Sequence, residues 1–242
     1  MPGRISICCP TRGRPANMRR LSKWIMDRSS HPENIELLFY VDNDDVESIN
    51  QAAEMVTNPP GHAVGYLVGP RLDLSKLNNI LAKDASNDII FILGDDVVVE
   101  SDGWDDIVYE QFERTEDKIM VLYGEDGVQD RIATHFLIHK NWVDTLGYVV
   151  PPIFPGDWQD EWITDVAVTI KRLVFDPRLK FMHYHPTSTV RGVQNDQTYL
   201  DKYNRDNYGR VGMNAFRNNA TLRNQNAMKL LSFIKRSKPC GG

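Results

Sequence analysis

The chain of 242 residues has few cysteines and no long apolar run. Cys8 and Cys9 are neighbours and Cys240 lies near the end, a pattern that supports neither a disulfide framework nor a zinc site. No stretch approaches the roughly 18 apolar residues that a membrane span needs. Residues 1–20 lack the apolar segment and the cleavage site of a secretory signal. We therefore expect a protein of the reducing cytoplasm with no membrane span.

The composition is that of an ordinary globular protein, with 41% hydrophobic and 25% charged residues, but the charge is uneven. Residues 1–170 contain 14 Lys/Arg and 29 Asp/Glu, a balance of -15. Residues 171–242 contain 14 Lys/Arg and only 4 Asp/Glu, a balance of +10. A basic last third suggests that this end meets a polyanion. The alternative is a surface helix that pairs with the acidic body of the same chain.

The first hundred residues alternate between strand and helix patterns. Apolar runs predict strands at residues 4–9, 35–41, 64–68 and 89–93. Helical spacing of apolar residues predicts helices at residues 16–28, 48–56 and 74–85. Further along, the patterns predict a helix at 104–114, strands at 119–124 and 133–138, helices at 141–146 and 160–173, and a strand at 178–184. This order predicts an α/β protein with a Rossmann-like sheet.

The most prominent segment is the apolar run 89–93, which is followed by Gly94, Asp95 and Asp96. Five apolar residues in a row indicate a strand that is buried on both faces, and such strands hold ligands at their carboxyl ends. Two carboxylates at the edge of an apolar sheet need a cation nearby, and a divalent metal that binds phosphate is the expected one. The alternative is a polar turn that ends the strand.

Two other polar segments follow predicted strands at the same edge of the sheet. The loop at residues 10–15 opens a helix, so its backbone N–H groups and the guanidinium groups of Arg12 and Arg14 could bind phosphate or a base carbonyl. Asp42 ends the second strand and could accept hydrogen bonds from a base or a ribose. Together with Asp95 and Asp96, these segments predict a site for a nucleotide diphosphate.

This order of motifs resembles the GT-A-fold glycosyltransferases, especially those like family 2, over residues 4–190. The resemblance implies a mixed Rossmann-like sheet flanked by helices, a nucleotide-sugar donor such as a UDP-sugar, and Mn²⁺ or Mg²⁺ as cofactor. It also implies a catalytic domain at residues 1–190, with a nucleotide-sugar half at 1–100 and an acceptor half at 101–190. The basic extension at 191–242 is expected to be helical and to pack on this domain.

The resemblance implies roles for single residues. The implied donor-binding residues are Pro10, Thr11, Arg12, Arg14, Asp42, Lys76 and Asp95. The implied metal ligands are Asp96, His183 and His185, although Gly94 stands where the family's Asp-x-Asp pattern has its first aspartate. An inverting transfer needs a base near the acceptor hydroxyl, and the candidates are Asp160, then Glu161, with Asp165 as a further rival. The alternative role of these acids is to complement the dipole at a helix start.

The acceptor is open at this point. The basic tail with interleaved aromatic residues is typical of an enzyme that acts on nucleic acid. The chain resembles phage enzymes that glycosylate hydroxymethylated pyrimidines in DNA, which would place it in the host cytoplasm. Contacts to such an acceptor are expected from Trp158, Arg191, Tyr208 and Arg210. The alternative is a polysaccharide or lipid-linked acceptor.

Three other classes of protein share parts of this pattern. Gly-Asp-Asp between apolar runs resembles the palm motif of RNA-dependent polymerases, but the chain is too short for fingers and thumb. A sugar nucleotidyltransferase should show a Gly-rich loop after the first strand, and residues 10–15 are not one. A non-catalytic nucleic-acid-binding module would explain the basic tail but would leave Asp95 and Asp96 without a cation.

Overall fold

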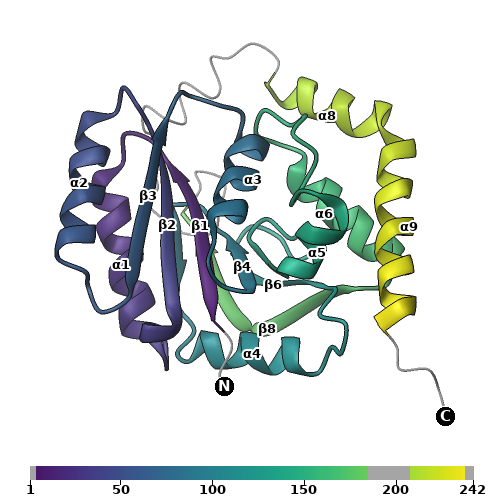
Figure 1. Ribbon diagram of the computed structural model, residues 1–242, viewed down its shortest axis with the longest axis horizontal. Coiled ribbons are helices and arrows are strands. Elements are labelled where there is room, and N and C mark those ends of the chain that lie inside the picture. Colours follow the sequence, from purple (N-terminus) through teal and green to yellow (C-terminus); the bar gives the residue numbers. More distant parts are fainter. Residues whose placement is uncertain (1–3, 185–207, 238–242) are drawn as a thin grey trace.

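One mixed sheet organises the protein in the computed structural model, which describes residues 4–184 and 208–237. The described strands lie in the order β3-β2-β1-β4-β7-β6-β8-β5, with helices on both faces (Figure 1). The strands are β1 (Ile5–Thr11), β2 (Ile35–Asp42), β3 (Ala63–Gly69), β4 (Ile89–Ile92), β5 (Val97–Val99), β6 (Val121–Glu125), β7 (Phe136–His139) and β8 (Leu173–His183). The helices are α1 (Pro15–Arg28), α2 (Val46–Thr57), α3 (Leu74–Asp84), α4 (Trp104–Glu113), α5 (Lys140–Leu146), α6 (Gln159–Thr169), α8 (Tyr208–Asn218) and α9 (Ala220–Ser237).

The first four strands of the sheet order, β3, β2, β1 and β4, pair in parallel. Their carboxyl ends therefore meet at one edge of the sheet, as the sequence predicted. The sheet then changes direction, because β7 pairs antiparallel with β4 and with β6. This change brings the start of β7 beside the end of β4, where the acidic pair Asp95 and Asp96 follows.

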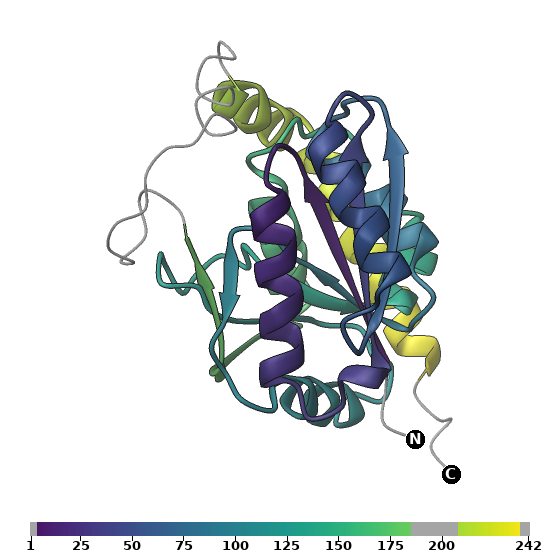
Figure 2. The same ribbon diagram turned by 90° about the vertical axis from the view of Figure 1, so that its left-hand side faces the viewer.

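The core lies in two layers, one on each face of the sheet. Strand β2 shows the division: Leu38 and Tyr40 belong to the layer under α3, α5, α6 and α9, whereas Phe39 and Val41 belong to the layer under α1, α2 and α4. Helices α1 and α2 lie side by side (Figure 2). Burial on both faces explains why β1, β2 and β4 appear in the sequence as nearly continuous apolar runs.

Beyond β4, the chain differs most from the predicted elements in two places. Helix α6 ends at Thr169 instead of residue 173, because Lys171 takes a left-handed conformation (φ 58°) that turns the chain into β8. Strand β8 accordingly begins at Leu173, five residues before the predicted start at 178. The short strand β5, which the sequence patterns did not predict, pairs with the end of β8.

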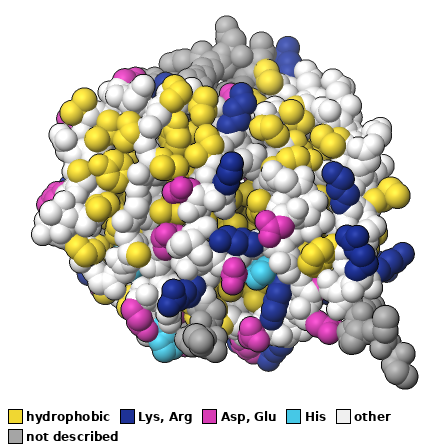
Figure 3. Space-filling view, in the orientation of Figure 1, with side chains coloured by type: hydrophobic (Ala, Val, Ile, Leu, Met, Phe, Trp, Pro, Cys, Tyr) yellow, Lys and Arg dark blue, Asp and Glu magenta, His cyan; other side chains and the backbone are white. Residues whose placement is uncertain are grey.

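The described part of the basic extension forms α8 and α9, which confirms that it is helical. Helix α9 packs against α5 and α6, and Ala227, Leu230 and Ile234 enter the same core layer as Trp142 and Trp162. Several Lys and Arg side chains, dark blue, lie on the right-hand side of the molecule in Figure 3, where Figure 1 places α9. Within residues 4–184 and 208–237, no helix combines the length and the apolar character that a membrane crossing would demand.

Asp105 joins the start of α4 to the loop after α1, and its side chain is fully buried. Its two oxygens accept hydrogen bonds from the backbone N–H groups of Ser30 and His31, each at 2.8 Å. We expect Asp105→Ala to lower the free energy of unfolding by about 3 kcal/mol, because two buried donors lose their acceptor.

Urea denaturation measures this loss, and Asp102→Ala is the matched control. The Asp102 side chain is 79% exposed and pairs with Arg28 at the surface, so its removal should change the free energy of unfolding by no more than about 0.5 kcal/mol. Equal losses in the two variants would show that the Asp105 contacts do not hold α4.

Candidate functional site

A cleft with a cavity volume of about 330 Å³ opens at the carboxyl ends of β1, β2 and β4. These ends contribute Thr11, Asp42 and Leu93 to its wall. Further parts of the wall come from the loop after β1, residues 71–72 after β3, residues 94–96, the start of α3, the residues before β7, the end of β8 and the segment 156–160. Because parallel strands end here, residues far apart in the sequence meet in one cavity.

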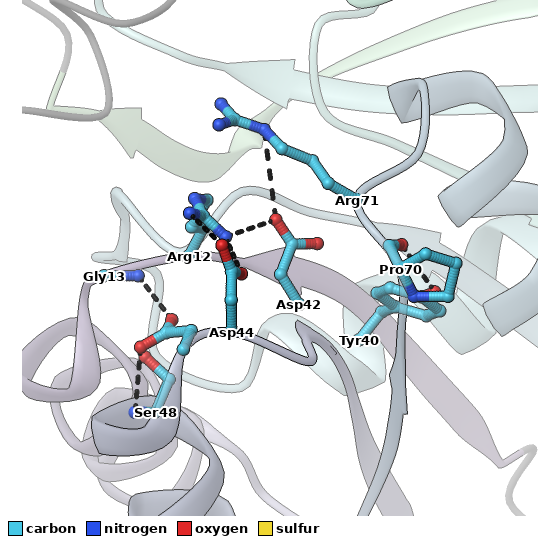
Figure 4. Close-up of polar contacts among 9 residues, drawn as sticks. Arg12, Gly13, Tyr40, Asp42, Asp44, Ser48, Pro70 and Arg71 are labelled. Carbon is cyan, nitrogen blue, oxygen red and sulfur yellow. Dashed lines mark hydrogen bonds and ion pairs between the residues drawn. The ribbon is translucent and has the colours of Figure 1, made fainter.

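One end of the cleft contains a carboxylate between two guanidinium groups (Figure 4). Arg12 donates a hydrogen bond to Asp42 at 2.8 Å and also pairs with Asp44, while Nε of Arg71 lies 4.0 Å from the same Asp42 oxygen. Asp42 is buried, and this burial raises its pKa, although the Arg12 guanidinium opposes the rise. Acceptor and donor groups of this kind suit the edge of a base or a ribose.

The acidic pair is held against the loop that follows β1. The Thr11 hydroxyl donates a hydrogen bond to Asp95 at 2.6 Å, and Arg14 donates to Asp95 at 2.8 Å and to Asp96 at 3.3 Å. Asp95 is only 3% exposed, and burial, more than the neighbouring Asp96, raises its pKa to about 6. Nε2 of His183, at the end of β8, lies 3.4 Å from Oδ1 of Asp96. The pair is thus contacted by side chains from two other parts of the chain, residues 11–14 and the end of β8.

Gly94 stands where the Asp-x-Asp pattern has its first aspartate, and the Asp96 carboxylate lies close to it. A Cβ atom built on Gly94 would lie 2.6 Å from Oδ1 of Asp96 and 3.4 Å from Cε1 of His135. The first distance is shorter than any normal contact. No side chain fits at residue 94 unless the Asp96 carboxylate moves.

Asp96 and His183 are the groups in this cleft that fit a divalent cation. A carboxylate and an imidazole in contact suit a transition ion such as Mn²⁺ better than Mg²⁺, which prefers oxygen ligands only. His135 lies beside them: its ring centroid is 4.7 Å from that of His183, and its buried Nε2 has no hydrogen-bond partner within residues 4–184 and 208–237. Among the described residues, no group of three His, Cys, Asp or Glu side chains is arranged as a metal site.

Among the three candidate bases, only Asp160 lines the cleft. It lies in the first turn of α6, and burial followed by the neighbouring Glu161 carboxylate raises its pKa well above the ordinary value. A carboxylate with a raised pKa takes up a proton more readily than an ordinary aspartate. Asp165 lies further along α6 and pairs with Arg223 at 2.5 Å.

Several predicted site residues lie elsewhere. Lys76 does not line the cleft, and its ammonium group pairs with Asp73 at 2.7 Å. Trp158 precedes α6 and packs on Phe216 of α8, with ring centroids 5.6 Å apart. Tyr208 is the first residue of α8, and Arg210 is exposed on the same helix. The remaining two, His185 and Arg191, lie outside the described residues.

The cleft also contains residues that the sequence analysis did not single out, among them Arg71, His135 and Asp157. Arg71 follows β3, and the rule that placed Asp42 at the edge of the sheet could have found it, because β3 is the next parallel strand. His135 precedes a strand that runs the other way. Without knowledge of that antiparallel pairing, the sequence gives no signal for His135.

Comparison with known sequences gives one weak likeness. No family model matches the chain. The O-antigen biosynthesis protein RfbC of Myxococcus xanthus is 25% identical over 182 residues, which are 72% of this chain and 14% of that protein. The chain thus spans only a small part of this curated relative.

Comparison with solved structures shows the fold. The mannosyltransferase PcManGT from Pyrobaculum calidifontis, solved with GDP-Man and Mn²⁺, matches with a TM-score of 0.65 at 12% identity, over 100% of this chain and 77% of that chain. S. aureus TarS matches with a TM-score of 0.58 at 14% identity, over 74% of this chain and 36% of that chain. Residues 1–349 of TarS were also solved with UDP-GlcNAc. The chain therefore has the GT-A, Rossmann-like α/β fold that the sequence resemblance predicted.

Arg14 is the positive group that the structure places on the buried acidic pair. We expect Arg14→Met to lower the free energy of unfolding by about 3 kcal/mol, because Asp95 then lies buried without a countercharge. Adding Asp95→Asn to the same chain should recover most of this loss, since a neutral amide needs no countercharge. Urea denaturation of the single and double variants measures both effects. Strictly additive losses would contradict the pairing.

Proposed function

We propose that this protein is a glycosyltransferase that moves a sugar from a nucleotide-diphosphate donor to an acceptor hydroxyl. The observation that carries the proposal is the meeting of four elements in one cleft: the loop after β1, Asp42, the acidic pair and Asp160. The GT-A fold supports it, because the similar proteins PcManGT and TarS were solved with GDP-Man and with UDP-GlcNAc.

In this proposal the donor nucleoside lies at the Arg12–Asp42–Arg71 end of the cleft. The Asp42 carboxylate accepts hydrogen bonds from a base N–H or a ribose hydroxyl, and the guanidinium groups donate to carbonyl or phosphate oxygens. The diphosphate lies near Arg14. As the bond from the sugar to the diphosphate breaks, negative charge grows on the leaving nucleotide, and a fixed positive group beside it lowers the barrier.

A divalent cation, Mn²⁺ before Mg²⁺, belongs to the proposal. Asp96 and His183 would hold it, and His185, by the family resemblance, is a further candidate ligand. When bound, the cation would neutralise charge on the diphosphate. The Mn²⁺ in the PcManGT complex supports this part of the proposal.

Asp160 is the proposed catalytic base, and it takes the proton from the attacking acceptor hydroxyl. Its place in the first turn of α6 and at the wall of the cleft supports this role over Glu161, which does not line the cleft. The free, buried thiols of Cys8 and Cys9 agree with the further proposal that the enzyme works in a reducing cytoplasm.

The acceptor is proposed to be polyanionic, with hydroxymethylated DNA as its most specific form. Residues 208–237 contain six Lys/Arg and no Asp/Glu. Arg223 pairs with Asp165 of α6, whereas the other five are exposed on α8 and α9: Arg210, Arg217, Lys229, Lys235 and Arg236. A row of exposed cations suits a phosphate backbone. A polysaccharide or lipid-linked acceptor is the second candidate, and the likeness to an O-antigen biosynthesis protein favours it.

Donor binding tests the first part of the proposal. Isothermal titration with UDP and with GDP should show binding of one of them, and Mn²⁺ should strengthen it about tenfold or more. Asp42→Ala should weaken this binding about tenfold, because a buried acceptor is lost. Lys83→Ala, an exposed change on α3, should leave the affinity within about twofold. Absence of binding for both nucleotides, with or without Mn²⁺, would overturn the proposal.

The base is tested by comparing two neighbouring acids. Asp160→Asn should lower kcat by a factor of about 10² or more and leave the donor affinity unchanged, because general-base catalysis is lost and the nucleoside contacts stay. Glu161→Gln should have a smaller effect. Mass spectrometry of hydroxymethylated DNA, plain DNA and a polysaccharide, each incubated with a panel of sugar donors, measures the transfer. A larger loss in Glu161→Gln than in Asp160→Asn would reverse the assignment.

A further inference from the structure

We propose that α8 positions the acceptor-side turn, which we define as residues 156–158, and thereby controls use of the acceptor rather than of the donor. This inference rests on the proposed transferase function and extends it to a part of the chain that lies outside the cleft. Two residues of α8 carry it, Gly212 and Phe216.

The acceptor-side turn joins the cleft to α6. Gly156 and Asp157 line the cleft, and α6 begins at Gln159, directly after Trp158. The backbone of Trp158 has a φ of 76°, in the left-handed region that residues with large side chains rarely adopt. Such a conformation persists only where its surroundings hold it. The direction of α6, and with it the position of Asp160, depends on the backbone conformation of Trp158.

Helix α8 packs against the acceptor-side turn so closely that the backbones of the two segments are in contact. Gly212 is buried, and a Cβ atom built on it would lie 2.5 Å from the carbonyl oxygen of Asp157 and 2.8 Å from Cδ1 of Trp158. One turn further along α8, the ring centroid of Phe216 lies 5.6 Å from that of Trp158 and 6.4 Å from that of Trp162. The helix thus contacts both the residue with the left-handed backbone and the helix that follows it.

Arg223 of α9 fixes α8 to α6 at the same place. Its Nε donates to Asp165 of α6 at 2.5 Å, and a second nitrogen donates to the backbone oxygen of Phe216 at 2.7 Å. Its guanidinium group lies 3.9 Å from the centre of the Phe216 ring and 5.3 Å from that of Trp162. Cation–π contacts and two hydrogen bonds therefore join three helices at one side chain.

The donor side of the cleft is built from other elements. Thr11 and Asp42 end β1 and β2, whereas Gly212 and Phe216 contact the acceptor-side turn and α6. A shift of α8 should therefore displace Asp157 and Asp160 and leave the nucleoside contacts in place. Its expected signature is a change in acceptor KM or in kcat at constant donor affinity.

Helix α8 offers a matched pair of glycines for the test. Gly209 and Gly212 lie about one turn apart on the same helix, so each can be replaced by alanine for comparison. At Gly209 the nearest atom to a Cβ would be Oδ2 of Asp157 at 3.7 Å, an ordinary contact. The two variants thus differ mainly in the collision between residue 212 and the backbone of the turn.

The experiment measures hydrogen–deuterium exchange of peptides that cover residues 155–163, acceptor KM and kcat, and the donor affinity by titration. Gly212→Ala should speed exchange in this segment and lower kcat/KM for the acceptor by about tenfold or more, with donor affinity within about twofold. Gly209→Ala should behave like the wild type. Phe216→Leu, which keeps bulk but removes the ring contacts, should change the same quantities in the same direction if Gly212→Ala does not fold.

Equal exchange in Gly209→Ala and Gly212→Ala, with Phe216→Leu like the wild type, would overturn the inference. So would a loss of donor affinity as large as the loss in acceptor kcat/KM. If the wild type binds no nucleotide, the proposed function fails, and the exchange comparison still decides whether α8 holds the turn.

Discussion

The cleft depends on one buried interaction, the contact of Asp95 with Thr11 and Arg14. A carboxylate that is 3% exposed would destabilise the fold by several kcal/mol without a partner, so the end of β4 and the loop after β1 must lie together. This contact brings Asp96 within 3.3 Å of Arg14 as well. The two strand ends then form a rigid edge on which the rest of the cleft is built.

The charges in the cleft are paired before any ligand arrives. Arg12 bridges Asp42 and Asp44, and these partners raise its pKa further, so it stays charged at every relevant pH. Arg14 bridges Asp95 and Asp96 in the same way. Both guanidinium groups are therefore held in place at the wall of the cleft. Such preorganisation lowers the cost of binding an anion.

The sequence predicted the parallel half of the fold well, because each of its strands carries its own local signal. The apolar runs of β1, β2 and β4 reflect burial on both faces, and the edge rule then places Thr11, Asp42 and Asp95 together. Lys76 does not line the cleft, and the reason is local: Leu77 and Asn78 of α3 face the cleft, and a helix turns about 100° per residue. Strand β5 exists only through its pairing with β8, some eighty residues later, which no local pattern reports.

The contacts of the basic last third agree with both roles that the sequence left open: binding a polyanion, and pairing with the acidic body of the same chain. Arg223 pairs with Asp165 of the acidic body, while five other cations of α8 and α9 are exposed. Both kinds of contact involve the same two helices. Arg223 and Phe216 hold α8 to α6, and α6 carries Asp160. A polyanion bound to the exposed cations would therefore contact helices that are joined to α6. The basic last third and the helix that carries the proposed base are therefore joined by contacts that only the folded chain contains.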